Sequence, residues 1–369
     1  MLGGGIAGCA AALALGQRGI DDVLIVEAGT YDCFHIGETI PPDTRLLLER
    51  LRLWDGFADQ GHEPCLGSRS AWGADDVGYN DFLLNPHGVG WHLDRRKFGA
   101  FLAERAGQSG AEVRSGTRFV AAERGADDTL AVLLQMGEEL ERIPAKFVVD
   151  ATGLHSRFAK AMGATPLLHD RLLWIGGVLD RPADLAPSQL TMIEAVEYGW
   201  WYAARVPDGR TIVGAITDAE TNRRIALHRP GRWLLHLEKT RHMTAWLADC
   251  RFGNDRLTIR PAPSFVLDRI CGSDWLAVGD AAAAYDPIAS QGIHKALSDG
   301  LLSAAAIADH LAGIHSAFDG YAASITAGFA DYLSNRNYLY GSERRWPSST
   351  FWQNRARTPD RTSLWPAES

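Results

Sequence analysis

The order of apolar and polar positions predicts alternating helices and strands along this chain. An apolar helix-like run, Cys9–Arg18, follows a glycine-rich turn, and a short apolar strand, Val23–Val26, comes next. The stretch 172–217 is typical of strands separated by turns, as in an antiparallel sheet. A further strand near residue 275 leads through small residues into a long helix that ends near residue 312. These periods predict an α/β fold.

The glycine-rich turn has the spacing of a dinucleotide-binding loop. Gly3, Gly5 and Gly8 form Gly-x-Gly-x-x-Gly, with Ala7 in the last gap, and Glu27 follows about 20 residues later at the end of the next strand. Glycines let the backbone approach a pyrophosphate, the helix N-terminus offers free N–H groups, and a carboxylate accepts from a ribose hydroxyl. A structural tight turn is the alternative.

The start of the chain is short for such a unit. Only two residues precede the loop, whereas a buried strand needs about five. We therefore expect the numbered chain to begin inside its first strand, or to have lost it.

A second group of candidate cofactor residues follows the strand near residue 275. Asp280 comes directly after this strand, and the small residues behind it permit close approach of a ligand. The pair Asp286-Pro287 then precedes a helix that begins near Gly292 and continues with Ile293 and His294. The N-terminus of this helix faces whatever lies in the turn.

The loop 37–42, Gly-Glu-Thr-Ile-Pro-Pro, cannot continue a helix or a strand, so we expect a shaped loop there. Helix resumes at Asp43, and Arg45 lies in its first turn, where the helix dipole disfavours a cation. An anionic partner such as a phosphate would explain Arg45. A solvated arginine explains it equally well.

Composition narrows the function classes. The chain has 369 residues and a net charge of −8, which argues against general nucleic-acid binding. No apolar run approaches the 18 or so residues that span a bilayer, and no secretory leader is visible, so we expect a cytoplasmic protein. The five cysteines form no Cys-x-x-Cys pair, so no metal site is predicted.

Aromatic residues gather at Trp200, Trp201 and Tyr202, as in a pocket for a flat group or in a core. The tail after Trp346 is polar, and we expect loose packing there.

Four motifs together resemble the FAD-binding pattern of the aromatic-hydroxylase class of flavoprotein monooxygenases. They are the glycine loop with Glu27, the run Asp150-Ala-Thr-Gly153, the pair Gly279-Asp280, and Asp286-Pro287 with Gly292. The resemblance implies that Asp280 binds ribityl or ribose hydroxyls and that the N–H groups of Ile293 and His294 face the flavin N1–C2=O edge. No His or Cys is poised to attach the flavin, so we expect non-covalent FAD.

The implied fold is a Rossmann-like FAD-binding domain with an inserted antiparallel β-sheet substrate domain and C-terminal helices. We assign 1–70, 92–168 and 265–315 to the FAD-binding domain. The substrate domain takes 71–91 and 169–264, and a C-terminal helical region and tail takes 316–369.

Four runs, 37–42, 70–73, 85–95 and 199–207, resemble the branch beside the tryptophan halogenases. That branch includes flavoproteins that hydroxylate a protein tryptophan in tryptophylquinone biogenesis, as for quinohemoprotein amine dehydrogenase. Arg95 matches an FAD-contacting position of the branch, and a surface salt bridge is its alternative role. Halogenases carry a lysine some thirty residues beyond the Gly-Glu loop, whereas the first lysine here is Lys97. Their Trp-x-Trp-x-Ile-Pro run also has a different counterpart, Tyr202-Ala-Ala-Arg-Val-Pro207.

The resemblance therefore implies an FAD-dependent monooxygenase that uses molecular oxygen and a flavin C4a-hydroperoxide to hydroxylate an indole, that of a client protein or peptide. His294 and Tyr202 are the best candidates for a catalytic acid or base, against simple packing. Glu38 is a third, although a loop-shaping hydrogen bond would explain it equally well. No second Gly-x-Gly-x-x-Gly follows, so electrons would come from transient NAD(P)H or a separate reductase.

Two other functions remain open from the sequence. One is a flavoenzyme that acts on a free small molecule, as an aromatic hydroxylase, halogenase or polyprenyl reductase. The other is a non-catalytic, flavin-stabilised partner that escorts a client protein.

Overall fold

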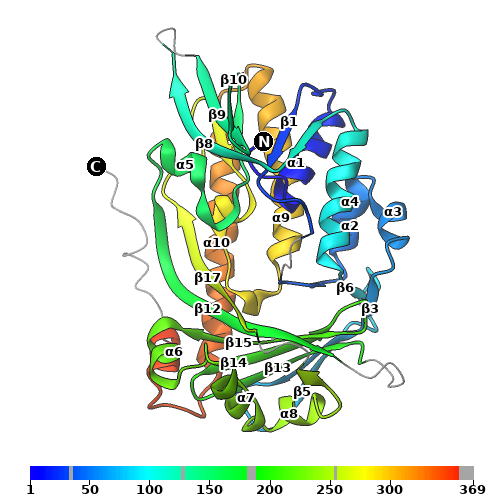
Figure 1. The fold of residues 1–369 in the computed structure, drawn as a ribbon, viewed down its shortest axis with the longest axis vertical. Helices are drawn as coiled ribbons and strands as arrows, with labels where there is room; N and C mark the ends of the chain where they lie inside the picture. The colour runs from blue at the N-terminus through cyan, green and yellow to red at the C-terminus, as the bar shows by residue number, and fades with distance from the viewer. Residues whose placement is uncertain (33–35, 126–128, 181–187, 253–255, 357–369) are drawn as a thin grey trace.

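The computed structural model describes residues 1–32, 36–125, 129–180, 188–252 and 256–356. Two halves lie one above the other in Figure 1, with helices around a parallel sheet above and a broad curved sheet below. One long helix and two long strands extend through both halves. This arrangement confirms the predicted α/β fold.

The upper half is built on a parallel sheet. Strand β1 (Leu24–Glu27) pairs with β7 (Glu112–Ser115), and β11 (Val148–Asp150) pairs with β18 (Trp275–Ala277). Leu2 forms parallel bridges to both Val26 and Asp150, and so joins the two pairs into one sheet. This single bridged residue lies where we expected the first strand.

Helices cover this sheet, chiefly α1 (Ile6–Gly16), α4 (Arg95–Gln108) and α9 (Gly292–Leu311). A Cβ atom on Gly300 would lie 2.6 Å from Cβ of Ala10, so α1 and α9 can approach each other closely only because position 300 lacks a side chain. The shorter elements of this half are α2 (Thr44–Arg50), α3 (Trp54–Ala58), α5 (Arg157–Ala161), the meander β8 (Thr117–Arg124), β9 (Leu130–Met136) and β10 (Glu139–Ala145), and the small sheet of β2 (Thr39–Ile40), β6 (Gly90–His92) and β3 (Glu63–Cys65).

The lower half is a nine-stranded sheet that is antiparallel except where β13 pairs with β4. Its order is β19 (Ala283–Ala284), β17 (Thr258–Leu267), β12 (Pro166–Asp180), β15 (Thr211–Asp218), β14 (Gly199–Arg205), β13 (Leu190–Val196), β4 (Gly67–Ala71) and β5 (Gly78–Asp81), and β16 (Arg251–Phe252) pairs with β12.

Both faces of the large sheet are covered. Because side chains alternate along a strand, Trp201 packs on one face against Trp233, and Trp200 packs on the other against Tyr340 and Trp352. Trp200 and Trp201 are therefore core residues and not pocket walls. The first face carries α6 (Ala219–Ile225), α7 (Pro230–Glu238) and α8 (His242–Trp246), and the second carries α10 (Ala317–Ser342) and α11 (Thr350–Ala356).

The C-terminal region is packed more firmly than the sequence indicates. Phe351 and Trp352 on α11 are buried, and the Trp352 indole N–H donates to the carbonyl oxygen of Val196 at 2.9 Å. The expectation of loose packing after Trp346 is wrong for α11, because the side chains of Phe351 and Trp352 pack against the large sheet. Residues 357–369 lie outside the described residues, and the domain boundaries stay a prediction.

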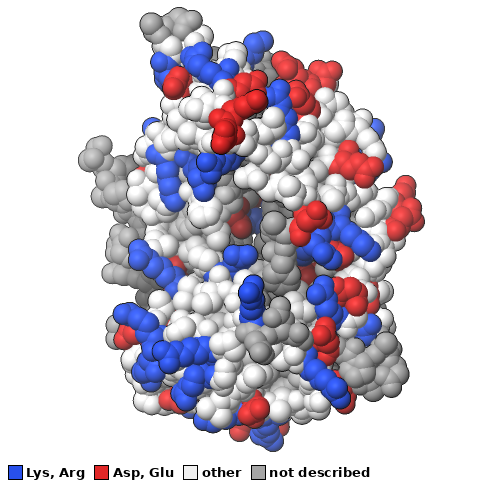
Figure 2. All heavy atoms as spheres, viewed as in Figure 1, with Lys and Arg blue, Asp and Glu red and all other residues white. Residues whose placement is uncertain are grey.

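No helix in the described part of the chain is long and apolar enough to cross a membrane. On the face shown in Figure 2, the described basic and acidic side chains are interspersed and form no continuous basic surface.

Candidate functional site

The glycine loop before α1 is shaped by close backbone contacts. Gly3 has φ +112°, and a Cβ there would lie 2.2 Å from the carbonyl oxygen of Ala151. A Cβ on Gly8 would lie 2.1 Å from the carbonyl oxygen of Gly3. A Cβ on Gly5, in contrast, would meet no atom within 4 Å. Gly3 and Gly8 therefore fix the turn, and Gly5 leaves open space at the helix N-terminus, where a pyrophosphate fits.

Glu27 lies beside this loop. Its Oε2 accepts a hydrogen bond from the N–H of Gly4, and its Oε1 accepts one from the N–H of Gly29, both at 2.8 Å. A carboxylate can accept about four hydrogen bonds, so Glu27 can hold the loop and still receive a ribose hydroxyl. The ribose contact stays a prediction.

The two glycine motifs meet directly. Gly279 has φ +62°, and a Cβ there would lie 2.7 Å from Cβ of Ala7. Asp280 is the middle residue of a short 3-10 turn that begins at Gly279. Burial raises the pKa of Asp280, whereas the positive charges of Lys295 and Arg95 lower it. The structure thus brings a carboxylate and two cations to the place where the first motif meets the second.

Lys295 is a residue of this site that sequence reasoning missed. Its buried ammonium group donates to the carbonyl oxygen of Gly279 at 2.9 Å and to Oδ2 of Asp299 at 2.7 Å. The only sequence signal was the four-residue spacing to Asp299 on one helix face.

The turn before α9 presents a helix N-terminus to the same region. Oδ1 of Asp286 accepts from the N–H of Ile288 at 3.0 Å, and Pro287 begins a 3-10 turn. A Cβ on Gly292, the first residue of α9, would meet nothing within 4 Å. The N–H groups of this first turn belong to Gly292, Ile293 and His294. Their contact with a flavin ring stays a prediction.

The two predicted arginines have different surroundings. Nη1 of Arg95 donates to the carbonyl oxygens of Ile36 and Gly37 at 2.9 and 2.7 Å. Burial lowers the pKa of Arg95, whereas the negative charges of Glu38 and Asp280 raise it. Arg95 therefore lies within reach of the charges of Glu38 and Asp280, and its contact with FAD stays a prediction. Arg45 instead pairs with Glu49 at 2.7 Å and lies over the ring of Trp54. A phosphate contact of Arg45 stays a prediction.

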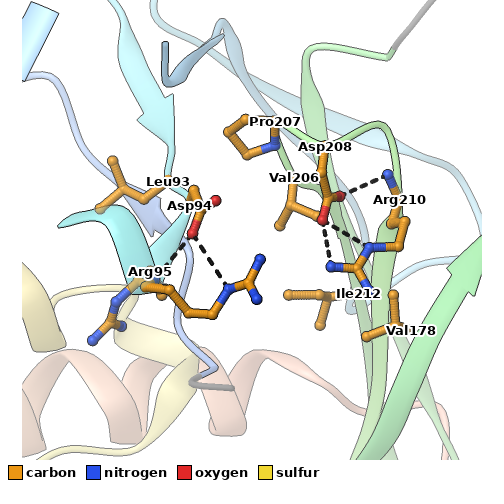
Figure 3. Close-up of a pocket in the computed structure, with 10 residues that line it drawn as sticks. Leu93, Asp94, Arg95, Val178, Val206, Pro207, Asp208, Arg210 and Ile212 are labelled. Carbon is orange, nitrogen blue, oxygen red and sulfur yellow. Dashed lines mark hydrogen bonds and ion pairs between the residues drawn. The ribbon is translucent and has the colours of Figure 1, made fainter. Parts of the chain in front are cut away.

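A small cleft of about 40 Å³ separates the start of α4 from the large sheet. Leu93, Val178, Val206 and Ile212 form its apolar lining. Figure 3 shows Asp208 and Arg210 paired on the sheet side, whereas the Arg95 guanidinium points away from that pair. The cleft lies between the two halves, beside the predicted FAD contact Arg95.

The two candidate catalytic residues contact the same segment, 39–44, at different points. The Tyr202 hydroxyl lies 3.0 Å from Oγ1 of Thr39, and Nδ1 of His294 lies 3.2 Å from Oγ1 of Thr44. Burial raises the pKa of Tyr202 well above its usual value. The described contacts do not join Tyr202 to His294, and the catalytic role of each stays a prediction.

The same neighbourhood holds polar residues that no motif indicated. Thr191 is buried on β13, and its Oγ1 lies 3.3 Å from Nε2 of His92. Because these residues are about a hundred positions apart in the chain, no local pattern could have joined them. Among the residues that the structure describes, no group of three His, Cys, Asp or Glu could hold a metal ion.

Asp280→Ala is expected to weaken FAD binding by roughly 10- to 100-fold, since a hydrogen bond to a charged group contributes about 1.5–3 kcal/mol. Asp280→Asn keeps an acceptor oxygen and should fall between Asp280→Ala and the native protein. Titration of apoprotein with FAD, followed by flavin fluorescence, measures all three. Equal affinities would remove Asp280 from the site.

Comparison with known proteins agrees with this geometry. A family described as "FAD binding domain" matches residues 1–324. A protein of Marinomonas mediterranea, provisionally described as the FAD-dependent oxidoreductase LodB, is 28% identical over 96% of this chain and 95% of its own length. The solved structure of CmlS, a flavin-dependent halogenase, has a TM-score of 0.86 at 22% identity over 98% of this chain and 68% of CmlS.

A third similar protein is QhpG, whose structure is described as a peptidyl tryptophan dihydroxylase essential for tryptophylquinone cofactor biogenesis. It has a TM-score of 0.77 at 22% identity and covers 98% of this chain and 78% of QhpG. Likeness to these two solved structures shows a shared fold.

Proposed function

Because the chain belongs to the FAD-binding domain family and is a flavin-dependent oxidoreductase of the hydroxylase and halogenase type, we propose that it hydroxylates an indole ring, that of a tryptophan in a client protein. Bound and reduced FAD would supply the activated oxygen. The chain itself binds and orients the reactants, stabilises charge and excludes water.

The observation that carries the proposal is the meeting of the predicted nucleotide motifs at one place. Gly5 leaves space before α1, Gly279 beside Asp280 lies against Ala7, and Gly292 leaves space before α9. The α9 N-terminus offers N–H groups and the positive end of a helix dipole, which stabilise negative charge. These features fit a reduced flavin ring at α9 and its pyrophosphate at α1.

The lysine positions favour hydroxylation over halogenation. About thirty residues after Glu38 the described chain has Arg69, whose guanidinium lies over the ring of Tyr79. Lys295 lies beside the motifs, but its ammonium group is held by Asp299 and the Gly279 carbonyl. The Lys295 ammonium group is therefore not free to hold and pass on a halogen, and Arg69 is an arginine where halogenases carry a lysine.

We therefore expect no incorporation of chloride or bromide into any aromatic substrate. Mass spectrometry of turnover mixtures with excess bromide measures this directly. A product heavier by one bromine would contradict the expectation, and Lys295→Met would then test whether Lys295 carries the halogen.

Exposed apolar side chains support a macromolecular substrate. Tyr79 on the edge strand β5 of the large sheet is 67% exposed, and Leu83 and Leu84 just beyond this strand are 82% and 93% exposed. Such a patch is typical of a surface that contacts another protein. The fold shared with QhpG also supports this choice, whereas the fold shared with CmlS supports a free small molecule as the alternative.

The client assignment predicts oxygen transfer to a polypeptide and poor transfer to free tryptophan. Turnover with labelled oxygen, followed by mass spectrometry, should compare free tryptophan with a tryptophan-containing polypeptide encoded beside this gene. A bulky client must itself help to close the site to water, so free tryptophan should mainly stimulate peroxide release. Efficient hydroxylation of the free amino acid alone would assign the protein to small-molecule hydroxylases.

Stopped-flow spectra of the reduced protein with oxygen and client separate catalysis from escort. A flavin oxidation rate that responds to the client supports catalysis, and a rate that does not would favour a flavin-stabilised binding partner. The electron donor is proposed to be transient NAD(P)H or a separate reductase, and each can be supplied in the same experiment.

A further inference from the structure

Glu38 has a fully buried carboxyl group whose two oxygens have no hydrogen bond of good geometry among the described residues, although the Tyr202 hydroxyl and the N–H groups of Gly37 and of Glu38 itself lie close enough to lower its pKa. Its backbone carbonyl oxygen accepts from the N–H of Leu93 at 2.7 Å, next to the pairing of β2 with β6. The main chain of Glu38 therefore shapes the loop through a well-formed hydrogen bond. The carboxyl oxygens form no hydrogen bond of comparable geometry, so they are open to a further role.

Opposing effects act on the pKa of Glu38, and burial is the largest of them. Burial raises the pKa of Glu38, whereas the Tyr202 hydroxyl and the Arg95 guanidinium lower it. Arg95 is held in place by the carbonyl oxygens of Ile36 and Gly37. A buried carboxyl with a nearby cation and a nearby hydroxyl, but no fixed hydrogen bond, can take up and release a proton.

The Tyr202 hydroxyl belongs to a line of polar groups that crosses between the two halves. It lies 3.0 Å from Oγ1 of Thr39, which lies 3.5 Å from Oγ1 of Thr191, which in turn lies 3.3 Å from Nε2 of His92. Burial lowers the pKa of His92 to about 4, so its ring is neutral near pH 7. Each hydroxyl can both donate and accept, so when Thr39 donates to the Tyr202 oxygen, the Tyr202 hydroxyl keeps its own proton for another acceptor.

The Tyr202 ring lies toward the cofactor side. It is half-buried and packs in the same apolar cluster as Ile36 and Ile288, and Ile288 belongs to the turn directly before α9. Tyr202 therefore keeps an exposed part that a substrate can reach, whereas the Glu38 side chain has no contact with solvent.

We propose that Tyr202 and Glu38 form a proton-accepting pair for the aromatic substrate, in which Tyr202 touches the substrate and Glu38 acts through it as a positioning residue. The inference rests on the proposed hydroxylation. As the oxygenated ring carbon loses its proton, the C–H electron pair returns to the ring and the proton passes to the Tyr202 oxygen. The Tyr202 hydroxyl proton passes at the same time to the Glu38 carboxylate. The pair returns this proton to water that enters when product leaves.

The kinetic test uses Glu38→Gln, Tyr202→Phe and the double variant in FAD-loaded enzyme. Each single variant should lower kcat by about a hundredfold, a usual size for general base catalysis, and the double variant should lose no more, while KM and FAD affinity stay near native. Because Glu38 must be ionised to accept, native kcat should rise with pH through the Glu38 pKa. This rise should vanish in Glu38→Gln. If the losses in kcat of the two single variants multiplied in the double variant, or if the rise of kcat with pH persisted in Glu38→Gln, the proposed pair would be wrong.

A stability test does not need the substrate. A carboxyl whose pKa is raised by folding contributes stability that is complete below its ordinary value of 4.5 and is lost as pH rises through the folded value. The melting temperature of Glu38→Gln relative to native should therefore increase with pH. A difference that is independent of pH would overturn the role of Glu38. If hydroxylation itself proves wrong, this result still stands, so the two failures are distinguishable.

Glu194 offers a matched control for Glu38, because it is also a buried glutamate. It lies on β13, in the same sheet as Tyr202. Its carboxylate accepts from the N–H groups of Arg241, His242 and Met243 at 2.6–3.0 Å. Glu194→Gln should lower stability and leave the rise of kcat with pH unchanged. A rise altered as strongly as in Glu38→Gln would show that any buried glutamate has this effect, and would overturn the pair.

Discussion

Arg336→Leu is expected to lower the free energy of unfolding by about 3–5 kcal/mol, the usual effect of removing one partner of a buried ion pair. Arg336 is 3% exposed on α10, and its Nε lies 3.3 Å from Oδ2 of the fully buried Asp286. Its Nη2 also pairs with Asp170. Leucine would fill much of the space but would leave the Asp286 carboxylate without its cation. Urea unfolding followed by tryptophan fluorescence measures the loss.

Arg142→Leu is the control for Arg336→Leu. Arg142 pairs with Glu123 at 3.2 Å, but both side chains are about half exposed, and such surface pairs contribute about 0–1 kcal/mol. Equal stability of the two variants would show that Arg336 is not an essential partner of Asp286.

The second large effect concerns two glycines of one loop. Gly3→Ala places a side chain at φ +112° and 2.2 Å from a backbone oxygen. Backbone strain of this kind costs about 1–3 kcal/mol, and the rigid contact adds to it, so we expect a lower melting temperature and purification without FAD. Differential scanning fluorimetry with and without FAD, together with flavin absorbance, measures both effects.

Gly5→Ala should separate folding from cofactor binding. Its Cβ meets no protein atom within 4 Å, so the apoprotein should melt as the native apoprotein does. The added methyl group would enter the space assigned to the pyrophosphate, and FAD affinity should fall at least about tenfold, or 1.4 kcal/mol. Full FAD affinity in Gly5→Ala would place the pyrophosphate elsewhere.

The cofactor motifs were predictable because their physics is local. At Gly3, Gly8 and Gly279 the backbone conformation or a close contact within a turn leaves no room for a side chain. Such a requirement is visible in the sequence as glycine at a fixed spacing. The α/β order was predictable for the same reason, since period and turn residues act over short distances.

The rest depends on contacts between distant segments. The sequence around 61–90 looks irregular, yet β4 is a strand because it pairs with β13, more than a hundred residues later. Trp200 and Tyr202 look equally suited to a pocket, and only the packing of α10 and α11 makes Trp200 a core residue. Thr39 and Thr191 are 152 positions apart, so the polar line through Tyr202 had no sequence signal.

The charges around Asp170 have a consequence for biosynthesis. A β-bulge in β12 lies just before Asp170, between Leu168 and Asp170. Asp170 binds both Arg336 and Arg355, and Arg336 also binds Asp286 in the turn before α9. During translation the chain emerges from its N-terminus, so Asp286 is made about fifty residues before its cation. The turn that precedes α9 can therefore form the ion pair between Asp286 and Arg336 only when synthesis of α10 is nearly complete. A ribosome stalled before residue 336 would carry a nascent chain with the glycine loop already made but with this turn still unsecured.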